Sequence, residues 1–417
     1  TMGYLYALAR NLYDKTTALR TLLLLAVLPF YFATGMVMTA DAPLVAAWAA
    51  TLYYMERALL GERNWAWLGM GIAFGLGILS KYTLGLLGPA ALLFVILDPA
   101  SRRWLYRPHA YLAAALALLL FSPVIIWNMQ HDWASITFQS QRATGIGNKF
   151  SLQWLFLHML LLLTPVGLAA AAMALWQGEN HRSGLYARRR RLFVLVFTGV
   201  PLAAFFWLSL FGAPKFHWTG PAWLALLPAM AWMMGQAGDF STLGRGVRAA
   251  WKPAVAVCLF LYAFVLHYVV LGIPGIPYAG FGEHYFWREA TREVERITET
   301  VQHQTGQKPI VVGMSRWSVA SSLSFYNKSE EPMEIRSRNL FGDEAAMYDF
   351  WYPSEPPTRR PIILVGMKPK ELERNRQGNE ISAKLIRPGP VQERTIVREG
   401  KHLRKIYYRV AQGYLGK

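Results

Sequence analysis

Residues 65–97, WAWLGMGIAFGLGILSKYTLGLLGPAALLFVIL, contain a single charged side chain, that of Lys81. A helix needs about 20 apolar residues to cross the hydrocarbon core of a bilayer. This stretch is therefore long enough for two membrane spans, with Lys81 at the turn between them. The same alternation of apolar segments and short loops runs from Thr1 to Gly272, which indicates a polytopic helical membrane protein.

The apolar segments predict about nine full spans. They cover approximately residues 20–38, 42–58, 64–80, 83–99, 109–128, 152–176, 192–212, 219–236 and 253–272. The apolar run Thr1–Ala9 is too short to span, so we expect at least one further span upstream of it. No signal peptide is visible, and none is required where the spans themselves insert.

Basic residues are concentrated in every second loop of this region. One set of loops holds sixteen of them: Arg10, Lys15, Arg20, Arg57, Arg63, Arg102, Arg103, Arg107, Arg182, Arg188, Arg189, Arg190, Arg191, Arg245, Arg248 and Lys252. The intervening loops hold four: Lys81, Arg142, Lys149 and Lys215. Short loops rich in Lys and Arg remain cytoplasmic. The second set is therefore expected to face outward.

The remaining 23 basic residues lie beyond Gly272, in a segment that follows an outward-running span. The net charge of +18 is thus spread over membrane loops and a separate domain. Nucleic-acid binding is excluded because it requires one basic face. Cys258 is the single cysteine and lies in the last span, so the outer domain is expected to fold without a disulfide.

Residues 273–417 change in character and predict an extracytoplasmic α/β domain, separate from the transmembrane bundle of residues 1–272. Residues 283–303, 317–326 and 369–376 have helical patterns. Residues 309–313, 361–366, 381–386, 394–397 and 405–410 have strand patterns. The predicted fold class is mainly α, a polytopic transmembrane bundle with this α/β domain at its end.

Polar residues at the predicted outer ends of the spans are the candidate site. An ionisable side chain at the membrane boundary is costly unless solvated or paired, which makes it a functional candidate. The candidates are Asp41, Lys81, Tyr82, Trp127, Asn128, His131, Asp132, Trp133, Arg142, Lys215 and His217.

Simpler roles exist for several of these residues. Asp41 precedes an apolar run and is a good helix N-cap. Lys81 is long enough to extend its ammonium group to the interface. The run Arg188–Arg191 is most simply a topology signal.

Acids, cations and aromatics at one membrane face suit sugar transfer from a polyprenyl-phosphate donor. A carboxylate such as Asp41 can act as general base toward the acceptor hydroxyl. Lys81, Lys215, His217 and Arg142 can stabilise the phosphate leaving group. Tyr and Trp suit the interface and stack on sugar rings.

Several short motifs, in order, resemble the protein O-mannosyltransferase and aminoarabinose-transferase superfamily, which is glycosyltransferase family 39-like and has the C-type fold. The matching segments are Ala40–Leu44, Gly75–Tyr82, Pro123–Trp133, Phe138-Gln139, Lys215–Trp218, Ser321–Tyr326 and Tyr348–Trp351. Each motif is weak by itself, but the ordered set covers nearly the whole chain.

The resemblance implies an enzyme of the bacterial inner membrane that takes part in envelope biogenesis. Its expected partners are a polyprenyl-phosphate sugar and a lipid A, glycan or protein acceptor. It implies no cofactor and leaves divalent-metal dependence open. The family's first outer loop, which carries an acid resembling the general base, would lie upstream of Thr1, whereas Asp41 matches a later acidic position. A transporter or flippase of a lipid-linked sugar and a non-catalytic membrane assembly protein remain as alternatives.

Overall fold

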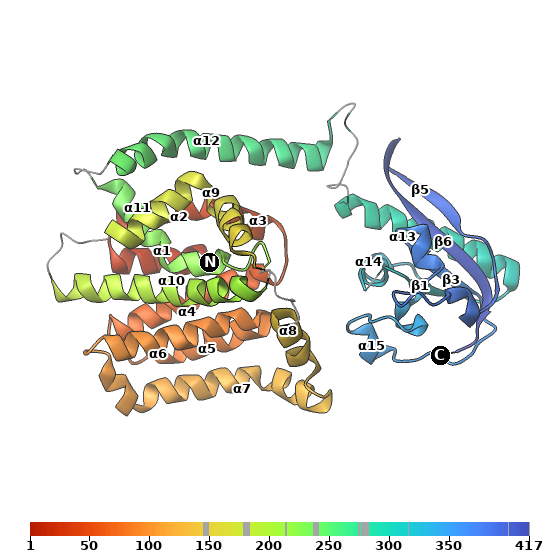
Figure 1. Cartoon of the computed structure of the whole chain (residues 1–417), viewed down its shortest axis with the longest axis horizontal. Coiled ribbons are helices and arrows are strands. Elements are labelled where there is room, and N and C mark those ends of the chain that lie inside the picture. The colour runs from red at the N-terminus through yellow and green to blue at the C-terminus, as the bar shows by residue number, and fades with distance from the viewer. Residues whose placement is uncertain are drawn as a thin grey trace. The chain divides into compact units, whose positions relative to one another are not determined.

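The computed structural model describes residues 1–144, 150–177, 184–212, 215–236, 242–273, 276, 283–315, 317–398 and 400–416. These form two compact units, Thr1–Tyr262 and Ala263–Lys417. The first is a helical bundle and the second is built around a β-sheet (Figure 1). The division falls within the last helix of the bundle, whereas the sequence places it after Gly272.

The membrane unit consists of helices at every position where a span is expected. They are α1 (Met2–Leu12), α2 (Lys15–Val27), α3 (Pro29–Met36), α4 (Asp41–Leu59), α5 (Ala66–Ser80), α6 (Leu87–Leu97), α7 (Pro108–Gln130), α8 (Ala134–Thr144), α9 (Leu152–Gln177), α10 (Leu185–Phe211), α11 (Leu227–Gly235) and α12 (Thr242–Leu271). Short 3₁₀ helices, η1 (Tyr82–Leu86), η2 (Arg102–Tyr106) and η3 (Gly220–Ala225), lie between them.

Four of these helices, α7, α9, α10 and α12, are long and apolar enough to cross a membrane. The pair α2 and α3 passes the same test only as one span bent by 70°. The bend lies at Leu28, directly before Pro29, which has no backbone N–H to continue a hydrogen-bonded helix. The other expected spans are helical within the described residues but shorter.

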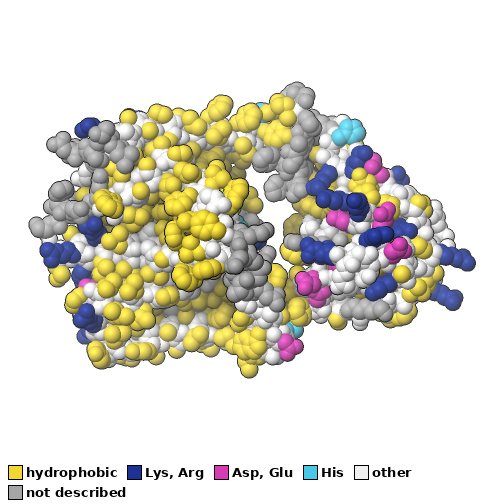
Figure 2. All heavy atoms as spheres, viewed as in Figure 1, with side chains coloured by type: hydrophobic (Ala, Val, Ile, Leu, Met, Phe, Trp, Pro, Cys, Tyr) yellow, Lys and Arg dark blue, Asp and Glu magenta, His cyan; other side chains and the backbone are white. Residues whose placement is uncertain are grey.

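Hydrophobic side chains cover the visible face of the membrane unit, and most of the Lys and Arg side chains seen on this face lie at one end of the helices (Figure 2). The apolar windows of α7 and α12 are only 11% and 6% buried within the protein. Apolar helices exposed in this way are stable in lipid rather than in water. The chain is a multi-pass membrane protein.

After the end of α12, the second unit contains α13 (Glu283–Thr305) and a six-stranded sheet in the order β2-β1-β3-β6-β4, with β5 paired to β6. Its strands are β1 (Ile310–Gly313), β2 (Glu334–Ser337), β3 (Ile362–Gly366), β4 (Leu385–Pro388), β5 (Gln392–Arg398) and β6 (Lys401–Tyr414). The shorter helices are α14 (Ser318–Tyr326), η4 (Arg338–Phe341), α15 (Tyr348–Trp351), η5 (Pro369–Leu372) and η6 (Ile381–Lys384).

Both faces of the central strands are buried. Val311 and Ile363 pack in one core with residues of α13 and α14, whereas Ile310 and Leu364 pack in a second core on the other face. This explains why β1 and β3 are continuous apolar runs and not alternating ones.

Two expectations for this unit are wrong in detail. The helix expected over 369–376 is only the short 3₁₀ segment η5, and the strand expected over 381–386 is η6 followed by β4. The strand β2 was not expected because it is a four-residue edge strand with charged residues at alternate positions.

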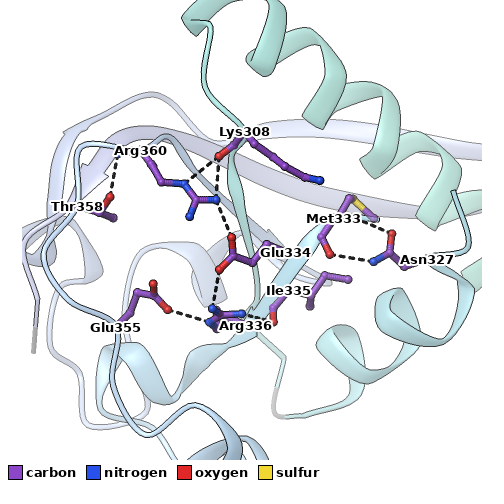
Figure 3. A network of polar contacts seen from close by, with 9 residues as sticks. All are labelled: Lys308, Asn327, Met333, Glu334, Ile335, Arg336, Glu355, Thr358 and Arg360. Carbon is purple, nitrogen blue, oxygen red and sulfur yellow. Dashed lines mark hydrogen bonds and ion pairs between the residues drawn. The ribbon is translucent and has the colours of Figure 1, made fainter. Parts of the chain in front are cut away.

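A network of ion pairs holds this edge strand in place (Figure 3). Arg360 binds Glu334 at 2.6 Å and the backbone oxygen of Lys308 at 3.1 Å. Arg336 binds the other oxygen of Glu334 at 2.6 Å and Glu355 at 2.8 Å. Burial raises the pKa of Glu334, but the Arg360 hydrogen bond and the charge of Arg336 outweigh it and leave that pKa below its ordinary value. The side chains of Glu334, Arg336, Glu355 and Arg360 are therefore all paired.

Candidate functional site

Asp41, the first residue of α4, forms the centre of the candidate site. Its side chain does not cap the helix, because the N-cap residue is Ala40 and no side-chain cap bond is present. Instead, Oδ1 of Asp41 accepts a hydrogen bond from Nζ of Lys81 at 2.7 Å. Asp41 is only 7% exposed. A buried carboxylate requires such a partner, since an unpaired one is strongly destabilising.

His217 contacts the other oxygen of the same carboxylate, with Nε2 3.5 Å from Oδ2. Burial lowers the pKa of His217, and the charge of Lys81 lowers it further, outweighing the opposite effect of Asp41. His217 is therefore neutral at neutral pH. The ion pair at this site is that of Asp41 with Lys81.

Local structure explains how these three side chains meet. The apolar helix α5 ends at Ser80, and Lys81 then adopts an extended backbone with φ of −162°. The hydroxyl of Ser80 donates to the backbone oxygen of Ala40 at 2.7 Å, which joins the end of α5 to the start of α4. This bond places Lys81 beside Asp41. Ser80 was not a candidate from the sequence, although its position next to Lys81 was a signal.

The turn that carries His217 is fixed from α3. The hydroxyl of Tyr31 donates to the backbone oxygen of Gly220 at 3.0 Å. A Cβ atom on Gly220 would lie 2.3 Å from the ring of Phe30, so only glycine allows this approach. The turn is therefore held against the bundle directly after His217.

Two further cations were expected at this site. Lys215 is exposed, two residues before His217, and its positive charge contributes to lowering the pKa of His217. Lys215 is thus within electrostatic reach of the cluster. Arg142 belongs to α8, but its side chain lies outside the described residues.

A second polar group lies next to Lys81 in sequence. The hydroxyl of Tyr82 is 2.9 Å from that of Ser135, and Ser135 donates to Oδ1 of Asn128 at 2.8 Å. Asn128 is 1% exposed and donates to the backbone oxygen of Val124 at 2.8 Å. These bonds join η1, α7 and α8. Ser135 was not predicted, because a serine in a polar loop gives no sequence signal.

The other expected residues lie at the end of α7. The rings of Trp127 and His131 stack with centroids 4.3 Å apart and planes 11° apart. Asp132 and Trp133 form the turn to α8 with φ of 49° and 57°, a conformation that is uncommon outside glycine. The amide of Trp133 donates to the backbone oxygen of Asn128 at 2.8 Å, which helps to hold this turn.

The charge of the Asp41 cluster suits an anion. At neutral pH it has one carboxylate, the ammonium groups of Lys81 and Lys215, and a neutral imidazole, so its net charge is positive. Among the described residues, no three His, Cys, Asp or Glu side chains converge in a way that could hold a metal ion. A phosphate group has the charge that the two lysines complement.

The sequence is similar to known glycosyltransferases. The family model described as dolichyl-phosphate-mannose-protein mannosyltransferase matches residues 1–127. The lipopolysaccharide core galacturonosyltransferase RgtB of Rhizobium johnstonii is 26% identical over 338 residues, which are 76% of this chain and 61% of that protein. The chain therefore spans about three fifths of the length of this relative.

Solved structures show the same fold. ArnT from Cupriavidus metallidurans bound to undecaprenyl phosphate aligns with a TM-score of 0.62 and 14% identity, over 98% of this chain and 81% of ArnT. The apo state of ArnT aligns with a TM-score of 0.60 over the same shares. The expected fold class, a helical membrane bundle with a C-terminal sheet domain, is confirmed.

Proposed function

We propose that this chain, which belongs to the glycosyltransferase family 39-like superfamily of polytopic C-type glycosyltransferases, transfers a sugar from a polyprenyl-phosphate donor to an acceptor outside the cytoplasm. The observation that carries the proposal is the partly buried ion pair between Lys81 and Asp41, with His217 on the second carboxylate oxygen. The complex of ArnT with undecaprenyl phosphate supports a donor of this class.

In the proposed reaction, the oxygen of an acceptor hydroxyl forms a bond to the anomeric carbon of the sugar. The bond from that carbon to the donor phosphate oxygen breaks, and its electron pair remains on the phosphate. Lys81, with Lys215 nearby, stabilises the negative charge that grows on this oxygen, and the acceptor proton passes to a base. Preorganised cations act most strongly on charge that develops in the transition state.

Asp41 is better suited to hold Lys81 than to act as the base. Its two carboxylate oxygens contact Lys81 and His217, so neither is directed only toward an acceptor. We therefore assign Asp41 a positioning role, in place of the general-base role considered from the sequence. Arg142 stays a proposed phosphate ligand.

The aromatic residues at the end of α7 and in the turn to α8 are proposed to bind substrate. Trp127 and His131 already stack on each other, and Trp133 is 47% exposed, which leaves its ring accessible to a sugar. Tyr82 and Asn128 are proposed to orient this region through Ser135, with Asp132 in the adjacent turn.

The test is mass spectrometry of envelope lipids and glycans from a strain that lacks the gene. We expect one envelope component to lose a single sugar, and a plasmid copy to restore it, whereas a copy with Lys81→Ala should not. A flippase would instead leave its sugar on the polyprenyl lipid, which would accumulate in the deletion strain. An unchanged envelope, or full restoration by Lys81→Ala, would contradict the proposal.

A further inference from the structure

A small polar cavity lies within the sheet unit and shares no residue with the Asp41 cluster. Its volume is about 140 Å³, and it lies between the end of η4 and the residues before η6. The side chains that matter for its chemistry are those of Phe341, Gln377, Asn379, Glu380, Ile381 and Lys384. Pockets for drug-sized molecules measure roughly 300–1,000 Å³, so this one takes a much smaller ligand.

The walls of the cavity are fixed by one buried side chain, Asn375, which is 9% exposed. Its Nδ2 donates to the backbone oxygen of Phe341 at 3.1 Å, which joins the two walls. Its Oδ1 accepts from the amides of Gln377 at 3.0 Å and Asn379 at 2.8 Å. The amide of Arg376 also donates to Asp343 at 3.0 Å. The cavity is therefore preorganised, which lowers the entropic cost of binding.

The charged residues of the cavity differ from those of the ion-pair network at β2. Glu334, Arg336, Glu355 and Arg360 are all paired (Figure 3). Glu380 and Lys384 line one cavity, yet their side chains form no hydrogen bond or ion pair with any described residue. An acceptor and a donor group thus face the same space without satisfying each other.

The remaining lining suits a sugar ring. Among the described residues, the side-chain amides of Gln377 and Asn379 form one hydrogen bond, from Nδ2 of Asn379 to Oε1 of Gln377 at 3.5 Å, so most of their hydrogen-bonding capacity is unused. Phe341 and Ile381, each 2% exposed, form an apolar floor. Hydroxyl groups both donate and accept, and the C–H face of a pyranose is apolar, so a pyranose matches this combination. A lipid chain does not, because charged groups line the opening.

We propose that this cavity binds a single pyranose ring of a glycan, with Glu380 and Lys384 as its principal hydrogen-bonding groups. The assignment of that glycan as the acceptor rests on the proposed function. The binding itself does not, because it requires neither the donor nor the membrane cluster.

The test uses the full chain in lipid nanodiscs and saturation-transfer NMR with methyl α-glucopyranoside and methyl α-galactopyranosiduronate as probes. We expect at least one probe to bind the wild type. Glu380→Gln and Lys384→Met should each raise the dissociation constant of that probe about tenfold, as the loss of one hydrogen bond to a charged group implies. Glu330→Gln, at an exposed glutamate outside the cavity, is the matched control and should bind like the wild type.

Binding that depends on Glu380 and Lys384 supports the cavity even if the chain transfers no sugar. The proposal is overturned if neither probe binds the wild type, or if both variants bind as the wild type does. Neither of these results bears on the Lys81 assay, so failure of the cavity and failure of the transferase proposal are distinguishable.

Discussion

Lys81 and Asp41 are separated by forty residues in the chain and by 2.7 Å in the structure. Both were recognisable as candidates from the sequence, because isolated charges next to apolar runs are costly in a membrane. Their pairing was not predictable, since it depends on the packing of α5 against α4 and on the Ser80 bond to Ala40. The neutral state of His217 likewise depends on burial, which a sequence does not give.

His217 makes the site sensitive to acid. Its pKa is lowered from 6.5, mainly by burial and then by Lys81, so the folded protein binds this proton less tightly than the unfolded chain does. As the pH falls below 6.5, the unfolded chain takes up this proton before the folded protein does. The folded protein therefore loses stability over the range from pH 6.5 down to the lowered pKa. A protonated His217 would also compete with Lys81 for Asp41.

We accordingly expect the transfer activity of the wild type to decrease as the pH falls below 6.5. The activity of His217→Gln should not show this decrease. The measurement is the pH dependence of kcat/KM for both proteins. Identical acid limbs in the two profiles would show that another group is responsible.

At the scale of elements, small residues determine how α5 packs against α7. A Cβ atom on Gly71 would lie 2.6 Å from the backbone oxygen of Ala113, and one on Gly75 would lie 3.0 Å from Cα of Ala117. Gly69, Gly71, Gly75 and Gly77 recur along α5, and such small-residue spacing favours close helix packing. The partner helix was not identifiable from that spacing.

Gly71→Ala is expected to destabilise the protein by about 1–3 kcal/mol, because the added methyl group forces the two backbones apart. Gly199→Ala, inside α10, is the control, since a Cβ there meets nothing within 4 Å. Thermal unfolding in detergent should show a lower Tm for Gly71→Ala and an equal or higher Tm for Gly199→Ala. Equal Tm values for Gly71→Ala and the wild type would disprove the close contact.

The Arg188–Arg191 run has a structural role that its sequence did not reveal. Arg189 is 9% exposed, binds Asp98 through Nη2 at 2.9 Å, and donates to the backbone oxygen of Leu59 at 2.7 Å. It thereby links α10 to the ends of α4 and α6. The topology signal and this structural contact are compatible.

Arg189→Met should cost about 3–5 kcal/mol, because it leaves the buried carboxylate of Asp98 without its cation. Arg188→Ala removes the same charge from the same loop but at an exposed position, so it tests topology without breaking a buried pair. We expect a large decrease in folded yield and Tm only for Arg189→Met. Similar losses in both variants would assign the effect to the loop charge.

Long apolar helices and buried strands were predictable because their patterns depend on local sequence. The short elements were not. The edge strand β2 is stabilised by the ion pairs of Glu334 and Arg336, and η5 is stabilised by the turn around Glu371, which accepts from the amide of Met367 at 2.9 Å. The strand β2 depends on partners that are distant in the sequence, and η5 depends on the geometry of one side chain, so neither follows from a local sequence pattern.

At the scale of the whole molecule, the distribution of basic residues over the loops predicts the orientation. Sixteen of the twenty basic residues before Gly272 fall in one set of loops. Alkaline phosphatase fused after Gly272 should be active outside the cytoplasm, and the same enzyme fused after Arg191 should be inactive. The reverse pattern would place the Asp41 cluster on the cytoplasmic side and contradict the proposed site of transfer.

The most direct test of the proposed activity follows label from a polyprenyl-phosphate sugar to an acceptor in a single turnover, with the purified full chain in proteoliposomes. We expect transfer by the wild type and a rate about 10²–10³ lower for Lys81→Ala, as is typical when one charge-stabilising donor is lost. Lys15→Ala, at an exposed lysine that begins α2, should retain the wild-type rate. Transfer by Lys81→Ala at the wild-type rate, or no transfer by the wild type with any such donor, would contradict the account.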